Sequence, residues 1–358
     1  MTLSLLRVHH LRNLQTIEVE PCPGINVIWG GNGAGKTTVL EAIYLLGRGK
    51  SFRGSEVEPI VSIDHNEMLV FGRMAQTGTT ARTIGIKKAV KGQTQIRMNN
   101  KSVNRLSVLA KNLPLQILTP KTHEILERGS GYRRKFLDWA VFHVEHDYFQ
   151  LSNRYHRALK QRNAALRKAP NTAFAWDKEL IENGEILEVR RKNYISKLTP
   201  MFEVTLSRIM GRDDITIKYK RGWPESESYA DNIGRRQQDD VKRGYTGTGP
   251  HRADIEIEVL GHKVDKVVSR GEQKLVIAAL YLAQAMVALE KAELNPILLI
   301  DDLPAELDQE KRRLFLMELE RLGIQVFITG IEAGYFSSLT NPKMFHVKHG
   351  CIQHTDIG

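Results

Sequence analysis

Short apolar segments separated by turn residues fill the first third of the chain. Their length and β-branched content predict strands at residues 3–8, 16–19, 25–29, 68–71, 83–86, 95–98 and 115–118. Asn99-Asn100 predicts a hairpin turn. A glycine-dense loop follows the third strand, and residues 37–46 then have the composition of a helix, which we expect to end at Gly47.

The pattern changes after Pro120. Residues 121–210 hold many helix formers, with Pro170 and Pro200 as the expected breaks. Later segments predict strands at 215–219, 254–260, 296–301 and 325–329 and helices at 272–290 and 309–322. We therefore expect an α/β core formed by residues 1–120 and 250–358, interrupted by a mainly helical lobe at 121–249. The sequence shows no heptad pattern long enough for an extended coiled coil.

The composition indicates a globular protein and is compatible with a negatively charged partner. The 358 residues are 41% hydrophobic and 26% charged, as in globular proteins, and no apolar run approaches the ~20 residues that cross a bilayer. We expect no membrane attachment and no signal peptide. Cys22 and Cys351 lack metal-ligand spacing, which disfavours a disulfide framework or a zinc site and favours the reducing cytoplasm. A net charge of +11 fits a polyanionic partner.

Residues 30–37 match the phosphate-binding pattern G-x-x-x-x-G-K-[ST] between a predicted strand and a predicted helix. Backbone N–H groups at the positive end of a helix would surround the phosphates of ATP. Lys36 would reach the β- and γ-phosphates, and Thr37 would bind Mg²⁺. The flanking elements disfavour the alternative of a glycine-rich turn with a chance lysine. The expected ATP-binding residues are Gly30, Gly31, Asn32, Gly33, Ala34, Gly35, Lys36, Thr37 and Thr38.

A buried strand that ends in acid would complete this site. Four apolar residues, 297–300, precede Asp301 and Asp302. We expect Asp301 beside the phosphates, where it would hold Mg²⁺ with Thr37, and Asp302 facing the attacking water as general base. Lys36, Asp301 and Asp302 are thus the expected catalytic residues. Apolar runs ending in two aspartates also occur without this chemistry, but the pairing with a phosphate loop favours it.

A third motif selects the subclass. Residues 268–274, directly ahead of a predicted helix, resemble the signature motif of ABC-type ATPases. There the serine, the glycine backbone and the helix N-terminus address the γ-phosphate of ATP held by another subunit, a role that falls on Ser269 and Gly271. The interval to Asp301 suits a helix of ~20 residues, a turn and a strand. Residues 305–308 resemble the D-loop, and an N-cap role for Ser269 is compatible with the signature role.

Together with these motifs, further segments resemble the RecF family, within the SMC/Rad50-like ABC ATPases. They are 11–14, 50–53, 129–138, 161–163 and 249–252. The resemblance implies an ABC-type P-loop ATPase head with an inserted helical lobe and no long coiled coil. It also implies an ATP-dependent homodimer that binds single-/double-stranded DNA junctions independently of sequence. With RecO and RecR, such a protein helps RecA assemble at gapped DNA, in links with replication and the SOS response.

Residues 151–168 are basic and lack acid. At 100° per residue, Leu151, Tyr155, Leu159 and Leu166 form an apolar stripe. A solvated face and a phosphate-binding face remain open for the opposite side, without base readout. The candidate DNA-binding residues there are Arg154, Arg157, Lys160, Arg167 and Lys168. Arg162 falls in the apolar stripe, so we expect it to pair with a buried acid or to reach the lobe junction.

At two positions this sequence differs from many ABC ATPases in a way that affects the expected rate of ATP hydrolysis. Thr329 stands where many ABC ATPases place a switch histidine, and Asp302 is one methylene shorter than their glutamate. Both predict slow hydrolysis, typical of a timed DNA clamp. The alternatives are a nucleotide-binding subunit of a transporter or translation-associated ABC protein, and a scaffold ordered by ATP. For His251 we favour a structural role in a turn.

Overall fold

A parallel sheet holds the strands that flank the expected phosphate loop and acidic pair. Its order is β15-β14-β3-β13-β12-β8, with an antiparallel pair only at the β15 edge. β3, β12 and β13 are buried along almost their whole length, as expected for parallel strands covered on both faces. The strands are β3 (Ile25–Trp29), β8 (Leu115–Leu118), β12 (Ile297–Ile300), β13 (Val326–Gly330), β14 (Lys343–Lys348) and β15 (Cys351–His354).

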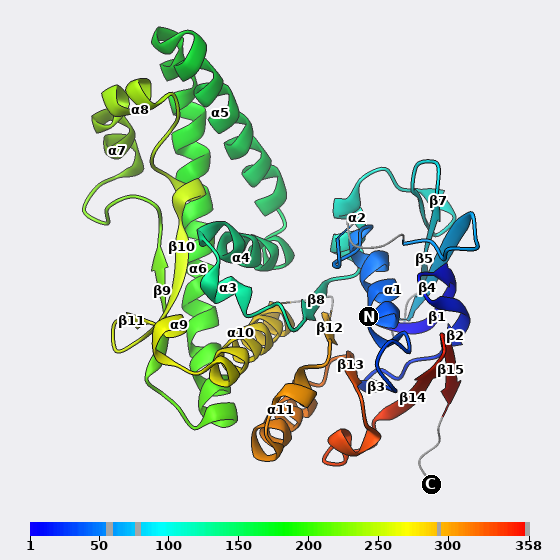
Figure 1. Cartoon of the computed structure of the whole chain (residues 1–358). Helices are drawn as coiled ribbons and strands as arrows, with labels where there is room; N and C mark the ends of the chain where they lie inside the picture. The colour runs from blue at the N-terminus through cyan, green and yellow to red at the C-terminus, as the bar shows by residue number, and fades with distance from the viewer. Residues whose placement is uncertain (55–59, 76–79, 292–294, 355–358) are drawn as a thin grey trace. The chain divides into compact units, whose positions relative to one another are not determined.

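An antiparallel sheet packs on the other side of helix α1 (Lys36–Arg48). One core cluster contains Leu6 of this sheet, Ile43 of α1 and Leu299 of β12. Both sheets therefore bury apolar side chains against one helix (Figure 1). α1 begins shortly after the end of β3, and the expected phosphate loop joins the two elements. The antiparallel strands are β1 (Thr2–Leu11), β2 (Leu14–Val19), β4 (Glu67–Ala75), β5 (Arg82–Ala89), β6 (Gln95–Met98) and β7 (Lys101–Ser102).

The computed structural model describes residues 1–54, 60–75, 80–291 and 295–354. Two compact units divide the chain. The first comprises Met1–Thr122, Arg208–Met210 and Ile277–Gly358, and the second comprises His123–Ser207 and Gly211–Val276. In the first unit, the remaining helices are α2 (Leu106–Asn112), η3 (Leu303–Glu306), α11 (Gln309–Leu322) and η4 (Ala333–Phe336).

Helices dominate the second unit. They are α3 (Glu124–Glu127), α4 (Ser130–Val144), α5 (Tyr148–Lys168), η1 (Pro170–Trp176), α6 (Asp177–Met210, whose last turn falls in the first unit), α7 (Tyr229–Arg235), α8 (Gln237–Arg243), η2 (Pro250–Arg252) and α9 (Val264–Val267). β9 (Ile215–Lys220) and β10 (Asp254–Val259) pair antiparallel, and β11 (His262–Lys263) extends their sheet. α10 (Arg270–Lys291) begins here and continues in the first unit.

The strands and helices expected by residue range are confirmed, with ends that differ by a few residues. Three expectations need correction. α1 runs past Gly47 and ends at a left-handed cap at Gly49. Gly47 makes room for Leu115 instead, because a Cβ on Gly47 would lie 2.4 Å from the Leu115 Cδ1. Pro200 lies inside α6 on an exposed face, where water can satisfy the carbonyl that it leaves unpaired. The second unit extends past the expected boundary at 249, because β9 pairs with β10.

By length and composition, one helix in the described part of the chain could cross a membrane. It is Arg270–Glu290, with a mean hydropathy of 1.3, and 72% of its apolar window is buried inside the protein. Its apolar residues are therefore accounted for as the core side of α10.

Candidate functional site

The phosphate loop joins β3 to α1 in a conformation that its glycines make possible. Gly30, Gly33 and Gly35 have positive φ values of 152°, 74° and 117°, and a Cβ on Gly30 would lie 2.2 Å from the carbonyl oxygen of Val347. The buried Lys36 donates hydrogen bonds to the carbonyls of Gly30 (2.9 Å) and Gly31 (3.1 Å). Its ammonium thus lies within the loop, where a phosphate would meet it together with the N-terminus of α1.

Two hydroxyl groups converge on the carboxylate at the end of β12. Thr37 donates to Asp301 at 2.9 Å, and Thr329 of β13 donates to the same oxygen at 2.9 Å. Burial raises the pKa of Asp301, and these two hydrogen bonds oppose the rise. The structure thereby brings Thr37 and Asp301, the expected Mg²⁺ ligands, within contact of each other.

These two oxygen donors fit Mg²⁺, which uses one or two protein oxygens and completes its shell with phosphate and water. No group of three or more His, Cys, Asp or Glu side chains that could hold a metal occurs among the residues described.

Asp302 sits beside this pair in an uncommon backbone conformation. Its φ of 51° places it in the left-handed region, which Asp tolerates better than most residues. The Thr329 hydroxyl accepts a hydrogen bond from its backbone N–H at 2.8 Å and lies 3.3 Å from its carboxylate. Asp302 lines a cavity of about 720 Å³ together with the phosphate loop, a volume in the range of small-ligand sites. Lys36, Asp301 and Asp302 therefore lie around one site.

The turn between β1 and β2 braces the phosphate loop from outside. The Asn13 amide donates to the carbonyl of Gly33 at 2.9 Å and accepts from the Thr38 hydroxyl at 2.9 Å. Next to it, Arg12 forms a two-point ion pair with the fully buried Glu41 of α1, at 2.6 and 2.8 Å. Reasoning from sequence did not assign these residues to the site. A charged Glu41 within the apolar pattern of α1 was the available signal.

Ser269 caps α10 in the second unit. Its hydroxyl accepts from the backbone N–H of Glu272 at 3.3 Å, while the Glu272 carboxylate accepts from the Ser269 N–H at 2.9 Å, a reciprocal capping box. A Cβ on Gly271 would meet no atom within 4 Å. Packing among the described residues therefore does not explain a glycine in this first helical turn, and the helix end is open to an approaching group.

The five candidate DNA-binding residues project from α5. Arg154, Arg157, Lys160, Arg167 and Lys168 are all exposed, and none forms an ion pair within the described ranges of the chain. The opposite face of α5 is buried through Leu151, Tyr155 and Leu166. The positive charge of this face is thus not offset by ion pairs among the described residues, which would suit contacts with phosphates.

Arg162 has a buried acid partner, Asp240, as its place in the apolar stripe predicts, and a second, half-buried partner, Asp177. Fully buried, it donates to Asp177 at 2.6 Å and to Asp240 at 2.7 Å. The structural role expected for His251 also fits, because Nε2 lies 3.0 Å from the Thr246 carbonyl and so donates, while Nδ1 accepts from the Tyr155 hydroxyl at 2.7 Å. Burial lowers the pKa of His251 to about 4.

Comparison with known proteins gives consistent matches along the chain. The profile of the RecF/RecN/SMC N-terminal domain family matches residues 2–353. DNA replication and repair protein RecF of Pseudomonas paraeruginosa is 38% identical over 100% of this chain and 99% of its own length. The RecF protein of Stutzerimonas stutzeri is 38% identical over 98% and 97%.

Solved structures agree with the sequence matches. A structure of the recombination mediator protein RecF with ATP, in the RecFOR pathway, matches with a TM-score of 0.84 at 27% identity, over 99% of this chain and 97% of that one. An SMC head domain from Pyrococcus furiosus matches with a TM-score of 0.62 at 13% identity, over 99% and 95%, and shows the shared fold alone.

Proposed function

The chain belongs to the RecF/RecN/SMC N-terminal domain family, as a RecF protein of DNA replication and repair, and from this premise we propose that it is an ATP-gated DNA clamp. Its fold is the ABC-type P-loop ATPase head, and no long coiled coil occurs among the residues described. The observation that carries the proposal is the contact of Thr37 with Asp301 beside the buried Lys36. Bound ATP would lie in the 720 Å³ cavity, with Mg²⁺ on Thr37 and Asp301.

We propose that ATP also closes a homodimer. The capped N-terminus of α10 and the open space at Gly271 support this, because a second protomer could bring them to the γ-phosphate of ATP. Binding energy from the nucleotide would then pull two copies together around DNA, and hydrolysis would release them.

We propose that the protein acts in the cytoplasm on gapped duplex DNA, at junctions between single and double strands. The exposed face of α5 would bind this DNA independently of its sequence. Its five basic side chains lie on a helix without acids, which supports sequence-independent contacts with phosphates. By family resemblance, the complex would act with RecR and RecO to help RecA assemble, with links to the SOS response.

Hydrolysis is proposed to be slow and stimulated by DNA. The Asp302 carboxylate is held near Thr329 at 3.3 Å, and Thr329 provides a hydroxyl where a switch histidine could exchange a proton. A short general base beside a threonine, where many ABC ATPases have a histidine, suits a clamp with a long closed state. Steady-state turnover at about tens per second would contradict this part of the proposal.

The central test is sedimentation of the full chain with and without ATP, and with and without gapped duplex DNA, at several salt concentrations. We expect ATP to shift the monomer to a dimer, and DNA binding to weaken steeply with salt because phosphate contacts release counterions. Ser269→Arg should block dimerisation while leaving ATP binding to the monomer. Lys36→Arg should retain some ATP binding and lose hydrolysis. Dimerisation of Ser269→Arg with ATP would contradict the shared-site arrangement.

A further inference from the structure

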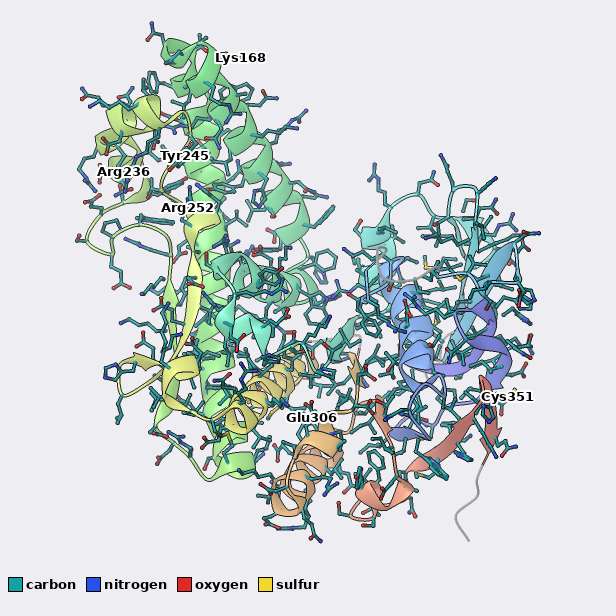
Figure 2. All side chains as sticks on the ribbon, viewed as in Figure 1. Lys168, Arg236, Tyr245, Arg252, Glu306 and Cys351 are labelled. Carbon is teal, nitrogen blue, oxygen red and sulfur yellow. The ribbon has the colours of Figure 1, made fainter. Side chains whose placement is uncertain are left out.

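A loop in the second unit presents an exposed aromatic ring among arginines. It comprises residues 244–249, between α8 and η2. The Tyr245 side chain is 40% exposed, and the Arg252 guanidinium lies over its ring at 5.4 Å from the centroid. Figure 2 shows Tyr245 with Arg252 and Arg236, and Lys168 at the end of α5. Such a ring, polar at one edge and open to solvent, calls for an explanation other than core packing.

Further arginines approach the same loop from α5 and from the flanks of α8. A Cβ built on Gly244 would lie 3.1 Å from the Arg167 Cγ. One built on Gly247 would lie 3.5 Å from Arg236 Nη2 and 3.6 Å from Arg243 Nη1. We use the name arginine–tyrosine loop for residues 244–249 together with the side chains that surround them, which are Arg167, Arg236, Arg243, Tyr245 and Arg252. None of its arginines forms an ion pair with any other residue that the structure describes.

A buried polar network holds this loop in shape. Asp240, fully buried, accepts from the Gly247 N–H at 2.9 Å and from Arg162 at 2.7 Å, so its charge is neutralised from inside. Asn163 accepts from the Thr246 N–H at 2.7 Å. The loop is therefore preorganised, and the Asp240 carboxylate beside it forms its ion pair with Arg162 and not with an arginine of the loop. Arg162, in the apolar stripe of α5, thus helps to hold the loop through its ion pair with Asp240.

We propose that the arginine–tyrosine loop binds the first unpaired nucleotide next to a duplex, with the base stacked on Tyr245 and its phosphate held by the arginines. The inference rests on the proposed DNA binding and deepens it by assigning a site for the single-stranded segment. Arginine forks match phosphate geometry. Bases inside a duplex are stacked on both faces by their neighbours, whereas an unpaired base can turn out of the stack and lay a free face on an aromatic ring.

The site is continuous with the proposed duplex surface. Arg167 belongs both to the exposed face of α5 and to the arginine–tyrosine loop. A duplex lying along α5 would therefore deliver its end to Tyr245. An acidic peptide could use the arginines but would have no need of an exposed ring, so the observations favour single-stranded DNA.

The test compares two DNA substrates with the full-length protein in the presence of ATP and Mg²⁺. One is a blunt duplex, and the other is the same duplex with a single-stranded extension. Tyr245→Ala should weaken binding of the extended DNA about tenfold and of the blunt duplex less than twofold, whereas Tyr245→Phe should bind both as the parent does. Arg157→Gln, on α5 away from the loop, is the matched control and should weaken both substrates equally.

A second measurement reports stacking itself. With 2-aminopurine at the first unpaired position, the parent and Tyr245→Phe should quench its fluorescence, and Tyr245→Ala should not. On DNA that is abasic at this position, Tyr245→Ala should cost no further affinity. Equal losses on both substrates, or unchanged quenching in Tyr245→Ala, would overturn the inference.

Two outcomes separate this inference from the proposed function. If the parent protein binds neither substrate, DNA binding and the loop assignment both fail. If the parent binds DNA and Tyr245→Ala behaves like it, the loop assignment alone fails. Competition by a polyglutamate peptide that depends on the arginines and not on Tyr245 would assign the loop to an acidic protein partner instead.

Discussion

Thr329 connects the two aspartates at the end of β12, so its replacement tests how the site is held. Its fully buried hydroxyl accepts from the Asp302 N–H at 2.8 Å and donates to Asp301 at 2.9 Å. Thr329→Val keeps the volume, so it creates no cavity. It leaves the part-buried Asp302 N–H without this partner, at a cost of about 1 kcal/mol, and removes a hydrogen bond to a charged group that contributes about 1.5–3 kcal/mol. Since Asp301 can relax by protonation, we expect a net loss of about 3 kcal/mol in the free energy of unfolding.

Hydrolysis should respond in a defined direction. Loss of one of its two hydroxyl donors raises the pKa of Asp301 further above its ordinary value of 3.8, in the direction that burial already imposes. Mg²⁺ needs the carboxylate form, so the decline of activity on acidification should begin at a higher pH in Thr329→Val than in the parent. We also expect at least a tenfold lower rate at neutral pH, because Asp302 loses its backbone anchor.

The assays are urea unfolding and ATP hydrolysis as a function of pH, with Thr329→Ser as the control that keeps the hydroxyl. Thr329→Ser should retain the pH profile and most of the rate. If Thr329→Val hydrolyses ATP as Thr329→Ser does, with the same decline at acidic pH, Thr329 does not position the aspartates.

Three further predictions concern residues outside the acidic pair. Arg162→Met should destabilise the protein by about 3–5 kcal/mol in urea unfolding, because it would leave the buried Asp240 without its arginine partner, whereas Arg157→Met should change stability by less than about 0.5 kcal/mol; equal effects would refute this. Asn13→Ala should weaken ATP binding about three- to tenfold in calorimetry, because it removes two hydrogen bonds to the phosphate loop and α1, and unchanged affinity would refute its bracing role. Arg157→Gln with Lys160→Gln should reduce the slope of log affinity against log salt by about 0.9 for each phosphate that is no longer neutralised, and an unchanged slope would remove α5 from the DNA surface.

Local sequence determined the elements that carry the chemistry. The glycine spacing of residues 30–37 places glycine at the three loop positions that have positive φ, and the apolar run 297–300 predicts a buried strand ending in acid. The hydrophobic pattern also predicted α11 with its observed bounds. The Asn99-Asn100 pair predicted a hairpin turn, and both residues have the positive φ that such a turn uses. In each case the signal lies within a few residues, where backbone sterics and hydrophobic burial act.

Tertiary structure alone decided which distant groups meet. The meeting of Thr329 with Asp301 depends on β13 pairing in parallel beside β12, and the brace from Asn13 depends on a turn between two strands of the antiparallel sheet. Pattern placed Arg162 in a buried stripe, yet Asp240 as its partner follows from packing over a long sequence separation. Such contacts cannot be read from a short stretch of sequence. They form because buried charges and N–H groups need partners, and folding decides which distant groups are close enough to serve.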